Sequence, residues 1–99
     1  SVNAIFATDH LLVTGDTAAY ASRADSGNLI VRRFCPSCGT PLFAEASARP
    51  DVRVVRVGAL DDPSRVRPDR VIWTASAPSW AHIDPALECA PGQPAPVKT

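Results

Sequence analysis

Two cysteines three positions apart, Cys35 and Cys38, are the residues of this chain whose type and spacing most directly suggest chemistry. Thiols at this spacing serve as metal ligands, as a redox pair or as a disulfide. The pair lies in the stretch RFCPSCGTPLF, residues 33–43, so that glycine, threonine and proline follow the second cysteine. The types of the residues around the pair must therefore indicate which of the three uses applies.

The residues that follow Cys38 favour a zinc knuckle over a redox motif. A redox pair places its first cysteine at a helix N-terminus, where the helix dipole stabilises the thiolate. Pro41 opposes a helix that starts at Cys35, because proline removes a helical N–H and clashes with the preceding turn. A knuckle needs a tight turn after a strand, which Pro36 and Gly39 favour. An inert or adventitiously oxidised pair is the remaining alternative.

A structural zinc ion takes four ligands, and this knuckle supplies two of them. Cys89 could be a third ligand, although a small buried hydrophobic role is the commoner one for such a cysteine. His10 and His82 each stand alone without a partner at ligand spacing, and a single histidine is more often an ordinary surface or turn residue. The chain therefore holds half of a structural zinc site.

The elements that must position this pair are β-strands, because short apolar and β-branched runs alternate with turn signals along the chain. We expect an all-β domain of about seven short strands and no long helix. The first three should form a meander, and the valine-rich sixth should be central. Asp61, Asp62 and Pro63 predict a turn or a single helical turn. The expected strands are residues 2–6, 11–14, 18–22, 29–34, 41–46, 52–59 and 71–74.

Composition limits the classes of partner and compartment. Ten basic and ten acidic residues give 99 residues a formal charge of zero, which disfavours nucleic acid and anionic membranes as partners. No apolar run approaches the length of a membrane span, and three cysteines are an odd number for a secreted disulfide framework. We expect a cytoplasmic protein with one domain at residues 1–89 and a proline-rich flexible tail at residues 90–99.

The stretch RFCPSCGTPLF resembles the second zinc knuckle of the glutathione-dependent formaldehyde-activating enzyme family, which includes centromere protein V. Other motifs recur in the order and at the spacing of that family, over residues 1–94. They are Ser26-Gly27, Arg32-Arg33, Gly58-Ala59-Leu60-Asp61-Asp62-Pro63, Ile72-Trp73-Thr74 and Ala77-Pro78-Ser79-Trp80. Several linked motifs are far more specific than a single cysteine pair.

The resemblance implies a β-tent domain with a structural and a catalytic zinc site, in a carbon–sulfur lyase that combines glutathione with formaldehyde to give S-hydroxymethylglutathione. It assigns Cys35 and Cys38 as structural ligands. The family's further ligands come from a CxC segment and a CxC-x-x-C loop, which this sequence lacks. No residue is thus assigned as catalytic, the chain resembles an N-terminally truncated member, and we expect it to be inactive alone. A non-catalytic zinc-binding structural or interaction module is the alternative.

Two further expectations concern the substrate and the missing ligands. Trp73 and Trp80 could line a substrate cleft for a glutathione-type molecule, although packing in the core or at its rim is the commoner role of such aromatics. Two chains could also pair as a homodimer, each giving Cys35 and Cys38, so that four thiolates close one shared zinc site.

Overall fold

The computed structural model describes residues 1–95 of the chain. They divide into two compact units, the first comprising Ser1–Arg65 and the second beginning at Val66. Within the described residues, no helix has both the length and the apolar character needed to cross a membrane.

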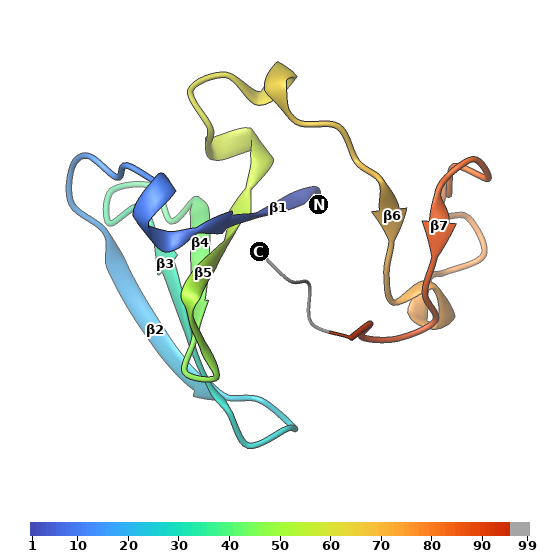
Figure 1. The fold of residues 1–99 in the computed structure, drawn as a ribbon, viewed down its shortest axis with the longest axis horizontal. Helices are drawn as coiled ribbons and strands as arrows, with labels where there is room; N and C mark the ends of the chain where they lie inside the picture. Colours follow the sequence, from blue (N-terminus) through green and yellow to red (C-terminus); the bar gives the residue numbers. More distant parts are fainter. Residues whose placement is uncertain (96–99) are drawn as a thin grey trace. The chain divides into compact units, whose positions relative to one another are not determined.

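The first unit is a five-stranded antiparallel sheet with the strand order β1-β5-β4-β3-β2 (Figure 1). Strands β2 to β5 follow one another as hairpins, whereas β1 pairs with β5, the strand of this sheet that is farthest from it in the sequence. Its strands are β1 (Asn3–Ala7), β2 (Ala18–Arg23), β3 (Leu29–Phe34), β4 (Pro41–Ala46) and β5 (Arg49–Arg56).

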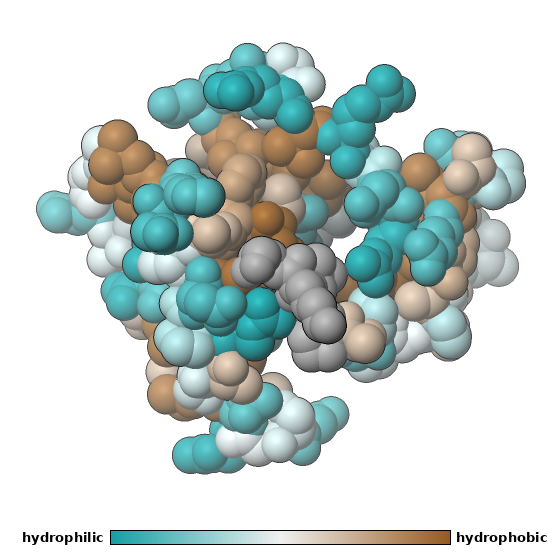
Figure 2. Space-filling view, viewed as in Figure 1, coloured by the Kyte–Doolittle hydropathy of each residue, from teal (hydrophilic) through white to brown (hydrophobic). Residues whose placement is uncertain are grey.

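The buried core of this unit centres on β4 and β5. Phe43 and Val55 are opposite each other in the β4–β5 ladder, so their side chains share one face of the sheet, and both are buried. Val52 is the third buried apolar residue, while Val54 on the opposite face from Val55 is 39% exposed. Apolar residues (brown) accordingly reach the surface among hydrophilic ones in Figure 2. The core is small, so few side chains determine its stability.

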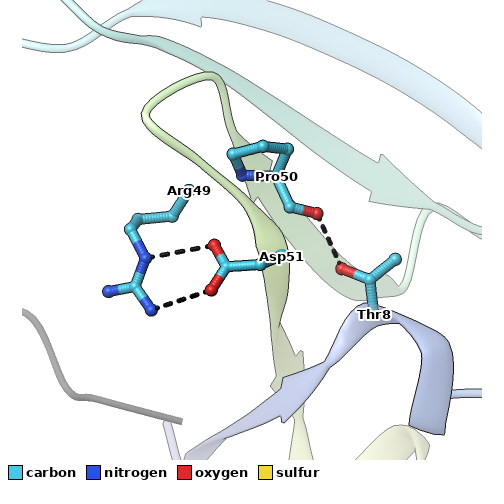
Figure 3. Close-up of polar contacts among 4 residues, drawn as sticks. All are labelled: Thr8, Arg49, Pro50 and Asp51. Atoms are coloured by element: carbon cyan, nitrogen blue, oxygen red, sulfur yellow. Dashed lines mark hydrogen bonds and ion pairs between the residues drawn. The ribbon is translucent and has the colours of Figure 1, made fainter.

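Short polar contacts fix the start of β5. Arg49 Nε and a terminal guanidinium nitrogen each donate to one carboxylate oxygen of Asp51 at 3.2 Å, and Thr8 Oγ1 donates to the carbonyl oxygen of Pro50 at 2.9 Å (Figure 3). Thr8 begins the 3-10 turn η1 (Thr8–His10), so the second contact ties this turn to β5. The turn after β1 is thereby held beside the sheet.

The expected all-β class is confirmed, and the structure has seven strands among the described residues. The observed bounds of β3 and β4 coincide with the expected residues 29–34 and 41–46. The valine-rich strand β5 lies between β1 and β4, so it is an interior strand, but the middle position of the sheet belongs to β4. No helix within residues 1–95 exceeds three residues.

Two expectations about the first unit were wrong. Residues 11–14 form no strand, and Leu12 is 89% exposed, because the first strand finds its partner in β5 and leaves no ladder for this segment. The expected meander of the first three strands is therefore absent. Strand β5 begins at Arg49 and ends at Arg56 instead of spanning the expected residues 52–59. Pro50 lies beyond the last β1 pair, Ala7 with Val52, so its missing N–H leaves that ladder intact.

The segment after β5 contains two short turns. They are η2 (Val57–Ala59) and η3 (Pro63–Arg65). Asp62 Oδ1 accepts a hydrogen bond from Ser64 N at 3.2 Å, which confirms the turn expected at Asp61, Asp62 and Pro63. The carboxylate satisfies a backbone donor in the first turn, where no helical acceptor exists.

The second unit contains a two-stranded parallel sheet of β6 (Arg70–Val71) and β7 (Glu88–Cys89), with η4 (Thr74–Ser76) between them in the sequence. The expected strand at residues 71–74 is therefore shorter and shifted, and β7 was not expected. Residues 90–93 of the predicted tail hydrogen bond to the segment around Trp73, for example Ala90 N to Val71 O at 2.8 Å. Flexibility of residues 90–99 stays a prediction, and residues 96–99 lie outside the described residues.

Candidate metal site

The Cys35–Cys38 pair occupies the turn between β3 and β4. Cys35 N donates to Thr40 O at 2.9 Å, and Gly39 N donates to Cys35 O at 2.8 Å, so the chain reverses within six residues. Gly39 has a φ of 78°, a left-handed conformation that residues with a Cβ rarely adopt. A register shift between Arg33 and Phe34 precedes the turn. The backbone thus doubles back immediately after a strand, as a zinc knuckle requires.

The Cys38 thiol is exposed, and its hydrogen bonds lower its pKa. Thr40 Oγ1 lies 3.0 Å from Cys38 Sγ. Hydrogen bonding from the Thr40 side chain, then from its backbone, and then from the Cys35 side chain lowers the pKa of Cys38. Thiolate is the form that ligates zinc, so this turn favours the state of Cys38 that binds metal. Cys35 is half-buried at the end of β3.

The structure also bears on the redox alternative. Residues 36–38 form a turn, and β4 begins at Pro41, so no helix starts at Cys35. The dipole that would stabilise a redox thiolate is therefore missing at this pair. A disulfide is absent too, since Cys35 and Cys38 are free.

The remaining candidate ligands lie elsewhere. His10 is exposed in η1, and in the second unit His82 is exposed and Cys89 is exposed in β7, with its Sγ 3.6 Å from Leu87 O. No group of three or more histidine, cysteine, aspartate or glutamate side chains suited to a metal occurs in residues 1–95. The structure brings together Cys35 and Cys38, and these thiols fit half of a tetrahedral zinc site.

Trp73 and Trp80 lie in the second unit, 52% and 84% exposed. Trp73 has a φ of 60°, and its indole Nε1 donates to Gln93 Oε1 at 3.2 Å. A left-handed conformation is unusual for a large side chain and occurs most often where surrounding contacts enforce it. The two cavities found in the first unit are lined by other residues. A cleft lined by these tryptophans stays a prediction.

A charged cluster on the sheet was missed in the sequence. Glu45 Oε1 lies 3.3 Å from Arg33 Nε and 4.0 Å from a terminal nitrogen of Arg53, whose guanidinium carbon lies 4.9 Å from the centroid of the Phe43 ring. These residues come from β3, β4 and β5, so only the strand pairing assembles them. Arg53 alternates with Val52 and Val54 in the usual pattern of a half-exposed strand, so the sequence contained no signal for this cluster.

The comparison with protein families identifies the class to which this fold and this turn belong. Residues 1–76 match the family of the glutathione-dependent formaldehyde-activating enzyme. The match includes the complete five-stranded sheet and the Cys35–Cys38 turn, and the chain therefore belongs to this family. The family relates the chain to the chemistry of glutathione and formaldehyde in general. A comparison with curated proteins gave no match.

Proposed function

We propose that this chain is part of a zinc-dependent carbon–sulfur lyase-like enzyme that combines glutathione with formaldehyde to give S-hydroxymethylglutathione. The observation that carries the proposal is the family match over residues 1–76. The free Cys35–Cys38 pair at the β3–β4 turn supports the zinc dependence, because its backbone geometry and the lowered pKa of Cys38 suit metal ligation.

Cys35 and Cys38 would hold a structural zinc ion, which would stabilise the β3–β4 turn when bound. Catalytic zinc needs a separate set of ligands and an open position for substrate. Beyond the knuckle, the 99 residues contain one more cysteine, Cys89. We therefore propose that the chain by itself binds zinc through the knuckle but does not accelerate the reaction.

The test compares the 99-residue chain with the polypeptide that carries it in its native cells. Zinc content is measured by elemental analysis, and formation of S-hydroxymethylglutathione from glutathione and ¹³C-formaldehyde is followed by NMR. We expect both proteins to bind zinc and only the native polypeptide to exceed the spontaneous rate. Replacement of Cys35 by serine should remove structural zinc, whereas Cys89→Ser is the matched control and should keep it.

The other outcomes are equally informative. If the chain alone accelerates the reaction, its proposed inactivity is wrong and the family's activity resides in these 99 residues. If neither protein accelerates the reaction although both hold zinc, the lyase proposal fails. That result would favour the alternative of a non-catalytic zinc-binding module.

A further inference from the structure

A cavity of about 340 Å³ lies on the sheet of the first unit, at the end of the β3–β4 hairpin away from the knuckle. Leu29, Val31 and Pro50 contribute apolar walls, and Glu45 and Arg53 contribute charged groups. This volume and this mixture of an apolar lining with a few polar groups are typical of sites for small molecules. We call it the Arg53 cavity.

Glu45 is shared by two arginines, of which Arg53 lines the cavity and Arg33 lies outside its lining. Arg33 and Arg53 are both within ion-pair distance of the single carboxylate of Glu45. Glu45 hydrogen bonds to Arg33 Nε at 3.3 Å, whereas its 4.0 Å distance to Arg53 is too long for a hydrogen bond. One carboxylate thus serves two guanidinium groups, and the excess positive charge remains on the Arg53 side.

Arg53 also keeps an unmet hydrogen-bond donor. Its Nε is buried and has no acceptor among residues 1–95, while the ring of Phe43 covers one face of the guanidinium. Burial of a donor without an acceptor is unfavourable, and each such group in a native protein calls for an explanation. A ligand that brings a negative charge into the cavity would neutralise the excess positive charge of the two arginines through the exposed part of the Arg53 guanidinium, and it would satisfy Nε once the side chain turns this donor toward the cavity.

We propose that the Arg53 cavity binds the carboxylate of a small peptide-like acid, which in the proposed reaction is the glutathione-type thiol. The identity of this acid rests on the proposed function, but the carboxylate chemistry rests on the cavity alone. A carboxylate accepts two parallel hydrogen bonds from a guanidinium, a geometry that a lysine ammonium cannot offer. The hydroxyl groups of Thr8 and Ser47, which also line the cavity, suit the amides of a peptide.

The position of the cavity keeps this role separate from the metal site. Leu29 and Ser47 lie at the opposite end of the β3–β4 hairpin from Cys35 and Cys38. Ser47 Oγ accepts a hydrogen bond from Leu29 N at 3.0 Å, which closes that end of the hairpin. A ligand at Arg53 would therefore leave both knuckle thiols free for zinc.

The experiment observes the Nε–H signals of ¹⁵N-labelled arginines by NMR during titration with S-methylglutathione, whose blocked sulfur cannot act as a thiolate ligand. Arg53→Lys assigns the Arg53 signal by its loss. We expect a saturating shift of this signal, at least tenfold weaker binding of the diethyl ester of S-methylglutathione, and weaker binding of acetate. Arg53→Lys should weaken binding tenfold or more by calorimetry. Arg23→Lys, which changes an exposed arginine at the end of β2, should alter binding less than twofold.

Carboxylate binding beside Arg53 is tested on the unmodified chain, so the experiment can refute the proposal even if Arg53→Lys does not fold. The backbone amides of residues 52–54 then take the place of the Arg53 signal. Absence of a shift around Arg53, or equal shifts with the ester, would overturn the proposal. Equal affinity for acetate and S-methylglutathione would show that the cavity recognises only a carboxylate and not a peptide-like acid. Binding at Arg53 together with a native polypeptide that lacks lyase activity would refute the proposed function and leave carboxylate binding supported.

Discussion

At the residue scale, the hydroxyl of Thr40 controls the thiol of Cys38. Thr40 contributes the largest effect that lowers the pKa of Cys38. Thr40→Val removes the hydroxyl, so the pKa of Cys38 should rise and less thiolate should be present at neutral pH. The pH midpoint of Cys38 alkylation by iodoacetamide, measured by peptide mapping of the metal-free chain, should move upwards. Thr40→Ser should retain the original midpoint, and an unchanged midpoint in Thr40→Val would contradict the role of this hydroxyl.

A second residue, Gly39, determines whether the knuckle turn can close. Its φ is 78°, and a Cβ added there would meet no atom within 4 Å, so the cost of Gly39→Ala is conformational and not steric crowding by neighbours. We expect Gly39→Ala to lower the free energy of unfolding by about 1–2 kcal/mol. Gly58→Ala is the matched control, since Gly58 also has open space and lacks a positive φ. Urea unfolding should show little loss for Gly58→Ala, and equal losses in both variants would refute the argument.

At the scale of elements, local sequence predicted those strands whose bounds depend on local turns. Strands β3 and β4 flank the cysteine turn, and their expected residues coincide with the observed ones. The pairing of β1 with β5 brings together segments about 50 residues apart, for example Ala4 with Val55. Strand propensity carries no information on such a partner, which explains why residues 11–14 were wrongly expected to continue a meander.

Two neighbouring valines of β5 should differ in their contribution to stability. Val55 is 4% exposed and faces Phe43, whereas Val54 is 39% exposed on the opposite face. We expect Val55→Ala to lower the free energy of unfolding by about 2 kcal/mol, through lost apolar burial and a residual cavity. The same change at Val54 should cost less than about 1 kcal/mol. Guanidinium unfolding of both variants measures the difference, and equal losses would show that the burial of Val55 against Phe43 adds no stability.

At the scale of the whole molecule, the two sites differed in how well the sequence could predict them. The cysteine pair lies within four consecutive residues, so its turn residues already predicted a knuckle, and the structure has this turn. The Arg53 cavity draws on three strands and η1, and the excess positive charge around Glu45 exists only after Arg33, Glu45 and Arg53 are brought together. A site contained in one turn can be predicted from the sequence. A site assembled by several strands depends on the register of the sheet, which local sequence does not specify.

The whole-molecule consequence of the knuckle concerns stoichiometry. Two thiols are half of a structural zinc site, and no group of three or more ligands occurs in the described part of the chain. We therefore expect the isolated 99-residue chain with zinc to form a dimer that holds one ion per two chains. Zinc should then raise the free energy of unfolding, and this gain should increase with protein concentration, because the complete site forms only between two folded chains. Native mass spectrometry with zinc analysis measures the ratio, with Cys89→Ser as the control that keeps it and Cys35→Ser as the variant that loses it. One zinc per chain, or a zinc-bound monomer, would show that the knuckle is completed within a single chain and that sharing between two copies is wrong.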